Sequence, residues 1–121
     1  MQFAQKNFYK KLLGRVGEDK AAAFLKAHGI KVLDRNYKNA FGEIDIIAKD
    51  GEYTVFCEVK TRSGDGFGAP SEAVDYRKRQ KYARIAKAYL LNNGLSDAAV
   101  RFDVIEIENG KINHIKDAFS L

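Results

Sequence analysis

Three charged residues, Asp45, Glu58 and Lys60, combine types and spacing that phosphodiester chemistry can use. Two carboxylates can hold a hard divalent ion such as Mg2+, which takes oxygen ligands and keeps several of its waters. Such an ion polarises a phosphodiester and lowers the pKa of a bound water. A nearby lysine can orient or deprotonate that water, or stabilise the developing negative charge.

Two antiparallel strands are expected to position these residues, over residues 42–49 and 52–60. A two-residue turn at Asp50-Gly51 sets Asp45 opposite Phe56 on the neighbouring strand. Opposed residues share a face, so Asp45, Glu58 and Lys60 project from the same side of the sheet. Asp45 and Glu58 then become diagonal neighbours at about 7–8 Å, close enough to converge on one cation. The other side of the first strand is predicted to carry three apolar residues, Ile44, Ile46 and Ala48.

The three charged residues could instead be ordinary charges on a solvent-facing strand surface. Amphipathic strands often carry charges on their solvent face, where a Glu58–Lys60 pair contributes about 0–1 kcal/mol. Two observations favour a site. The flanking segments are as apolar as central strands, and acids gathered on one face cost stability unless something binds them.

The remaining elements follow from apolar periodicity and turn signals. A helix is predicted over residues 14–28, ending at Gly29. Strands are predicted over residues 30–37, 100–108 and 111–116, and a second helix runs from Ser71 as its cap to about residue 93. Residues 1–13 form a basic N-terminal arm that could be a helix or a docked segment. The order is helix, three strands, helix, two strands, which predicts one α/β domain with a mixed five-stranded sheet flanked by helices.

Composition supports one domain with a polyanionic partner. The chain has 121 residues, a mass of 13.6 kDa, a net charge of +5 and a pI of about 9.3. Cys57 is the only cysteine, so no intramolecular disulfide can form, and a reducing, cytoplasmic location is expected. No apolar run suits a membrane span or a signal peptide, so no membrane association is expected.

These residues resemble a known pattern. Asp45, twelve further residues and then Glu58-Val59-Lys60 resemble the PD-(D/E)XK nuclease motif, with Ile44 in place of the proline that names it. The wider sequence resembles the YraN family at Gly17-Glu18, Arg35-Asn36, residues 42–45 and 56–62, Lys78 and residues 101–103. The resemblance implies a restriction-endonuclease-like fold over residues 14–121.

The resemblance also implies a metal site. Asp45 and Glu58 would hold Mg2+ or Mn2+, and the Val59 carbonyl could be a third ligand. Glu18 matches the first-helix glutamate of archaeal Holliday junction resolvases and would complete the site directly or through water. From the sequence itself, Glu18 could serve the helix dipole in a first turn, or point along the edge of the core.

Other roles follow the same resemblance. Lys60 would serve the attacking water, and Arg62 would contact phosphate. Lys78, near the start of the second helix, is a further candidate for nucleic-acid binding. Related resolvases pair two active sites, so a homodimer is implied.

Several residues have competing interpretations. Glu43 could be a metal ligand or an ordinary polar residue before a strand. The segment Gly64–Gly68, with Phe67 near its tip, could be a flap that stacks on a base or an unremarkable loop. Structural roles are favoured for the rest: Asp103 as a partner of Arg101, His28 as a helix cap, Cys57 in the core, and no role for His114.

Three functions are therefore considered. The first is a divalent-metal-dependent nuclease acting on DNA, with branched or structured DNA as a candidate substrate. The second is a non-catalytic nucleic-acid-binding module that uses Arg62, Lys78 and the basic terminus. The third is a protein-interaction domain whose charges are surface only.

Overall fold

The computed structural model describes residues 2–62 and 75–120. Its elements are α1 (Gln2–Ala27), β1 (Lys31–Asn39), β2 (Gly42–Asp50), β3 (Tyr53–Arg62), α2 (Tyr76–Asn92), β4 (Ala99–Glu108) and β5 (Lys111–Phe119). This confirms the predicted order and the α/β class with one mixed five-stranded sheet. The predictions for the loop at Gly64–Gly68 and for Phe67 fall outside the described residues. The predicted cap at Ser71 is wrong, because α2 begins at Tyr76 and its N-cap is Asp75, whose side chain accepts the Lys78 N–H.

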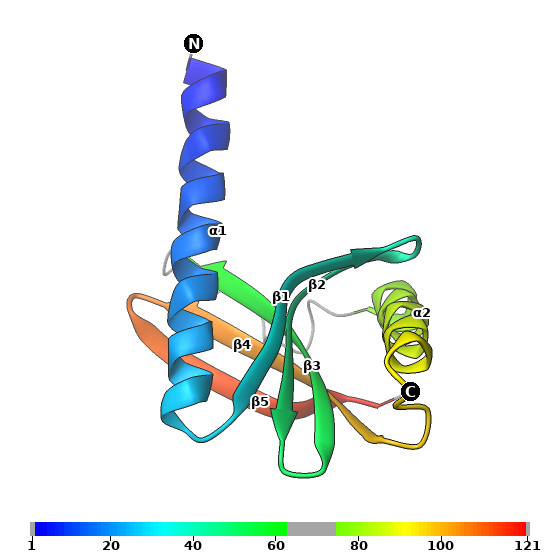
Figure 1. Cartoon of the computed structure of the whole chain (residues 1–121). Coiled ribbons are helices and arrows are strands. Elements are labelled where there is room, and N and C mark those ends of the chain that lie inside the picture. Colours follow the sequence, from blue (N-terminus) through cyan, green and yellow to red (C-terminus); the bar gives the residue numbers. More distant parts are fainter. Residues whose placement is uncertain (1, 63–74, 121) are drawn as a thin grey trace.

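The sheet has the strand order β1-β2-β3-β4-β5. All neighbours are antiparallel except β3 and β4, which are parallel. A parallel pair needs a crossover connection, and α2 lies in the segment that joins these two strands. The helices cover opposite faces of the sheet, as Figure 1 shows with α1 on one side and α2 on the other.

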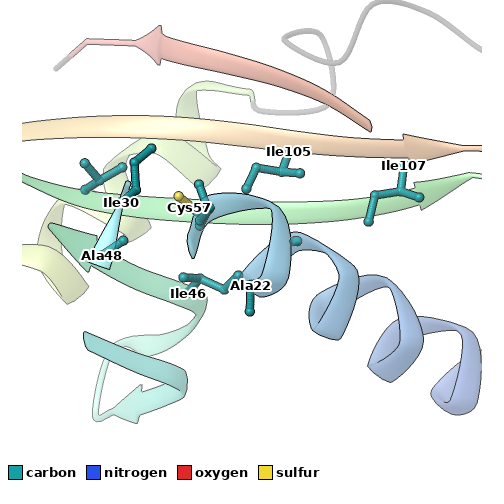
Figure 2. Close-up of a cluster of buried hydrophobic side chains, with 10 residues drawn as sticks. Ala22, Ile30, Ile46, Ala48, Cys57, Ile105 and Ile107 are labelled. Atoms are coloured by element: carbon teal, nitrogen blue, oxygen red, sulfur yellow. The ribbon is translucent and has the colours of Figure 1, made fainter. Parts of the chain in front are cut away.

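Each face of the sheet has its own hydrophobic core. The core under α1 is drawn in Figure 2, and its buried residues include Ala22, Leu25, Ile46, Cys57 and Ile105. The core under α2 is built from Ile44, Ile47, Phe56, Ile85, Tyr89, Phe102, Val104 and others. Cys57 is confirmed as a core residue, and burial raises the pKa of its thiol. The strands that carry the candidate site are thus anchored from both sides.

The register of the β2–β3 hairpin differs from the prediction by two residues. Asp50 pairs with Tyr53, so Gly51 and Glu52 form the turn, with Gly51 in the left-handed region at φ 59°. Asp50 stays within the strand, where its Oδ2 accepts a hydrogen bond of 2.9 Å from Arg101 Nη2. An even shift of register does not by itself move a side chain to the other face of the sheet.

The predicted shared face of Ile44, Ile46 and Ala48 is wrong. Ile46 and Ala48 pack under α1, but Ile44 packs under α2. The alternation breaks at Asp45, opposite a residue of β1, Asn36, that has a φ of 53°. Positive φ is tolerated by asparagine, and the β1–β2 hairpin bends so that its far end lies beside α2 (Figure 1).

Helix α1 is one continuous element that begins twelve residues before the predicted helix. It passes residues 13 and 14 without a break, and its first half projects beyond the sheet (Figure 1). The boundary between a basic arm and the domain stays a prediction. His28 Nδ1 donates to the Phe24 carbonyl oxygen at 2.8 Å, which confirms its capping role. Across the described ranges, no helix has the length and apolar character that a membrane span needs.

Candidate active site

The candidate site lies where β2 and β3 separate. Their ladder ends at the pair Ile46–Cys57, and Figure 1 shows β2 leading away toward α2 while β3 continues toward α1. Beyond the last pair, the side chain of Asp45 accepts a backbone hydrogen bond from β3: its Oδ2 accepts the N–H of Val59 at 2.8 Å. The carboxylate is thereby fixed in the opening between the strands.

Asp45 is the centre of a group of acids. Burial raises its pKa from 3.8 to about 6, although the hydrogen bond from Val59 opposes the change. The charges of Glu18, Glu58 and Glu43 raise the pKa further. The predicted approach of Asp45 to Glu58 is thus supported, with a correction to its geometry. Phe56 pairs with Ile47, and the ladder ends at Ile46–Cys57, so Asp45 does not lie opposite Phe56 as predicted.

Glu58 is held by two ammonium groups on one of its oxygens. Its Oε1 accepts from Lys78 Nζ at 2.6 Å and lies 3.2 Å from Lys60 Nζ. The other oxygen, Oε2, is buried and has no hydrogen-bond partner within the described part of the chain. A buried acceptor without a partner costs about 1–3 kcal/mol. This oxygen is therefore the most available donor atom for a ligand.

Two side chains of α2 reach this carboxylate. Lys78 pairs with Glu58, and that pairing outweighs burial, so the pKa of Lys78 is raised. Its contact to nucleic acid stays a prediction. Burial, the charge of Glu58 and a hydrogen-bonding interaction with the Glu58 carboxylate raise the pKa of Tyr82, so its phenol stays neutral and lies beside that carboxylate. Tyr82 was missed from the sequence. Its spacing of four residues from Lys78 places both on one helix face and could have indicated it.

The helix α1 approaches the site from the other face of the sheet. Gly17 is buried against β3, and a Cβ at this position would overlap Thr61 Oγ1. This close contact brings Glu18 near enough for its charge to act on Asp45. Glu18 lies mid-helix and half-buried, so the dipole interpretation is wrong and the core-edge interpretation is supported.

A groove runs between α1 and the ends of β3 and β4. It has a volume of about 700 Å3, and its lining includes Glu18, Val59, Thr61 and Arg62. Arg62 Nε donates to Glu106 Oε2 at 2.9 Å, so the guanidinium is already engaged with a carboxylate. Its phosphate contact stays a prediction. The groove leads from Glu18 along the strands that carry the site.

The donor atoms present fit a hard divalent ion. Over residues 2–62 and 75–120, no three Asp, Glu, His or Cys side chains form a ready cluster for a metal. The site offers instead the carboxylate of Asp45 and the spare oxygen of Glu58. Mg2+ is commonly bound through one or two carboxylates while keeping several waters, which matches this donor set. The Glu43 side chain is more exposed than that of Glu58, and its Oε2 lies 3.7 Å from Lys38 Nζ across the β1–β2 hairpin.

A second buried carboxylate, Asp103, belongs to a different cluster. Both of its oxygens accept from Arg101 at 2.9 Å, which confirms the predicted pairing. His114, for which no role was predicted, contacts Oδ2 at 2.7 Å, and the Asp117 N–H binds Oδ1 at 2.9 Å. The cluster links β4, β5 and the β2–β3 hairpin through Asp50, so it stabilises the sheet.

The fold and the site define an α/β domain with an acid group at the opening between two strands of a mixed sheet. Residues 17–107 match the family described as "Uncharacterised protein family UPF0102". A UPF0102 protein of Alkaliphilus oremlandii is 48% identical over 115 residues, covering 90% of this chain and 98% of that protein. One of Caldanaerobacter subterraneus is 44% identical over 121 residues, covering 94% and 99%.

The chain therefore belongs to the UPF0102 family, which confirms the resemblance to YraN. A third relative, from Persephonella marina, is 44% identical over 108 residues, covering 89% of this chain and 93% of that protein. The matched range begins at Gly17 and includes every predicted site residue.

Proposed function

We propose that this protein is a divalent-metal-dependent nuclease that hydrolyses phosphodiester bonds in DNA. One observation carries the proposal: at the opening between β2 and β3, Glu58 has a buried oxygen without a partner, next to the fixed carboxylate of Asp45. A buried acceptor is normally satisfied, so an unpartnered one beside a second acid favours a cation as its missing partner.

The residues of the opening would hold the ion. Asp45 and Glu58 are its carboxylate ligands, and Glu18 completes the site directly or through water. The Val59 carbonyl is a further candidate ligand. Mg2+ or Mn2+ in this position would supply Lewis-acid polarisation of the phosphodiester and a lowered pKa for a coordinated water.

Lys60 serves the attacking water in this proposal. Its Nζ lies 3.2 Å from Glu58 Oε1, so the same carboxylate that binds the ion keeps the lysine aimed at the site. The ammonium can orient the water or stabilise the negative charge that develops on the phosphate oxygens.

The substrate class follows from charge. The chain carries a net charge of +5, and Lys11 and Arg15 are exposed on the half of α1 that projects beyond the sheet. Basic side chains that neutralise phosphates make binding dependent on salt. Branched or structured DNA is the class to test first. The homodimer and the cytoplasmic location expected from the sequence stay predictions.

The test is cleavage of linear, flapped and four-way DNA with Mg2+ or Mn2+. Asp45→Ala and Glu58→Ala should lose both divalent binding by calorimetry and cleavage. Lys60→Ala should bind DNA and fail to cut it. Glu52→Gln, in the exposed β2–β3 turn, removes one negative charge as a matched control and should cut normally. Cleavage by all three site variants at the wild-type rate would refute the proposal.

A second candidate is a non-catalytic nucleic-acid-binding module. It is favoured by the two ammonium groups on Glu58, which already neutralise that carboxylate without any metal. Its DNA binding would be sensitive to salt and unchanged in Asp45→Ala. Binding without cleavage, equal in wild type and Asp45→Ala, would select this candidate.

A further inference from the structure

Lys78 makes the shortest contact in the candidate site. It lies in the first turn of α2, and its ammonium reaches across to β3 to bind Glu58 Oε1 at 2.6 Å. The Glu58 side chain is only 10% exposed, whereas that of Lys78 is 36% exposed. The carboxylate is therefore confined, and the ammonium that neutralises it has access to solvent.

A counter-ion is needed here on electrostatic grounds. Glu58 stands in a group of acids with Asp45, Glu18 and Glu43, and a largely buried charge without a partner is strongly destabilising. The ion pairs with Lys78 and Lys60 supply the compensation in the protein without a metal.

The same ion pairs oppose a divalent ion. A dication bound between Asp45 and Glu58 would lie close to both ammonium groups, and like charges at such range repel. The two lysines differ in freedom. Lys60 is 20% exposed and stands two residues from Glu58 on the same strand, whereas Lys78 belongs to a different element and is the more exposed.

We propose that Lys78 is an exchangeable counter-ion of the site: it neutralises Glu58 in the absence of metal and withdraws toward solvent when a divalent ion binds. This inference rests on the proposed metal site. It assigns Lys78 a role in regulating that site's occupancy, which differs from a contact to nucleic acid. A positioning residue that only held Glu58 in place would have the opposite effect on metal affinity.

Calorimetric titration with Mn2+ separates these roles without any measurement of cleavage. Lys78→Met removes the competing charge and keeps the length of the side chain, so it should bind Mn2+ about tenfold more tightly than wild type. Lys78→Arg keeps the charge and should bind no more tightly than wild type. The matched control is Lys87→Met, an exposed lysine of α2 about 13 Å further along the helix, which should leave the affinity unchanged.

Thermal unfolding supplies the second readout. In EDTA, Lys78→Met should melt below Lys87→Met, because Glu58 loses its nearest counter-ion. Saturating Mn2+ should then raise the melting temperature of Lys78→Met more than that of wild type, since tighter binding to the folded state stabilises it more.

The outcomes distinguish this inference from the proposed function. Mn2+ binding that is equal or weaker in Lys78→Met overturns the counter-ion role and leaves the metal site standing. No Mn2+ binding by wild type or Lys78→Met overturns both. Binding by Lys78→Met alone also overturns both, because Lys78 would then exclude the metal from the wild-type site and would not be exchanged. Binding that survives Glu58→Ala in the Lys78→Met background places the ion elsewhere and overturns the inference.

Discussion

Replacing Asp45 with asparagine should stabilise the folded protein at neutral pH while removing a ligand of the proposed metal site. Burial, followed by the charges of Glu18, Glu58 and Glu43, raises the pKa of Asp45 from 3.8 to about 6, against the opposing hydrogen bond from Val59. Asparagine carries no charge, and its side-chain oxygen can still accept that backbone N–H. The substitution therefore keeps the contact and removes the cost of burying a carboxylate among acids.

The sign and size of the effect follow from linkage. Between about pH 4 and pH 6 the folded state holds a proton on Asp45 that the unfolded state releases, so wild-type stability falls as pH rises through this window. At about 1.4 kcal/mol per pH unit, the difference between 3.8 and about 6 corresponds to a penalty of about 3 kcal/mol at pH 8. At pH 4.5 the penalty is only about 1 kcal/mol.

Urea unfolding in EDTA at pH 4.5, 6 and 8 measures this difference. The free energy of unfolding of Asp45→Asn should exceed that of wild type by an amount that grows with pH, up to about 3 kcal/mol. For a chain of this size, that difference corresponds to about 10 °C in melting temperature. Glu52→Gln removes an exposed negative charge and should stay within about 0.5 kcal/mol of wild type. An advantage of Asp45→Asn that is the same at pH 4.5 and pH 8, or a loss of stability at pH 8, would refute the reasoning.

Three further predictions concern the lysine, the helix contact and the second acid cluster. Lys60→Met should keep Mn2+ and DNA binding but lower the single-turnover cleavage rate by about 100-fold or more; unchanged cleavage would exclude its role. Gly17→Ala should cost about 1–3 kcal/mol in urea unfolding through its overlap with Thr61, whereas Gly14→Ala, with open space around it, should gain up to about 1 kcal/mol. Equal effects at the two glycines would contradict the close packing. Asp103→Asn should cost about 3–5 kcal/mol above pH 4, because it breaks a buried ion pair. The partners of Asp103 hold its pKa below 3.8, so its contribution to folding stability is lost only on further acidification. A loss of less than about 1 kcal/mol in Asp103→Asn would contradict the network.

The shared face of the candidate site could be predicted from the sequence because side-chain alternation has a period of two. Placing the turn at Asp50-Gly51 shifted the expected register by two residues, and an even error leaves Asp45 and Glu58 on the same side. The error did change the expected pairing, since the observed ladder pairs Phe56 with Ile47 and ends before it reaches either acid. Asp50 stays in the strand and contacts Arg101, which lies far from it in the sequence, so local turn signals did not include this partner.

The bend at Asp45 and the role of Lys78 could not be predicted. Ile44 lies under α2 although Ile46 lies under α1, and this break in alternation stands opposite Asn36 of β1, which has a positive φ. Strict alternation assumes a regular strand. Lys78 reaches Glu58 from another element, so its role depends on how α2 docks on the sheet. A basic helix face gives no sign of which lysine turns inward.

The two buried acids of β3 and β4 show how a structural carboxylate differs from one available to a ligand. Asp103 has partners on both oxygens, from two side chains and a backbone N–H, and its pKa is lowered. Glu58 has both of its ammonium partners on Oε1 and leaves Oε2 buried without one in the described chain. Partners for both oxygens are what stability alone favours. Of the two acids, Glu58 is therefore the one with an oxygen left open, at the point where β2 and β3 separate, and a bound cation is the partner we propose for it.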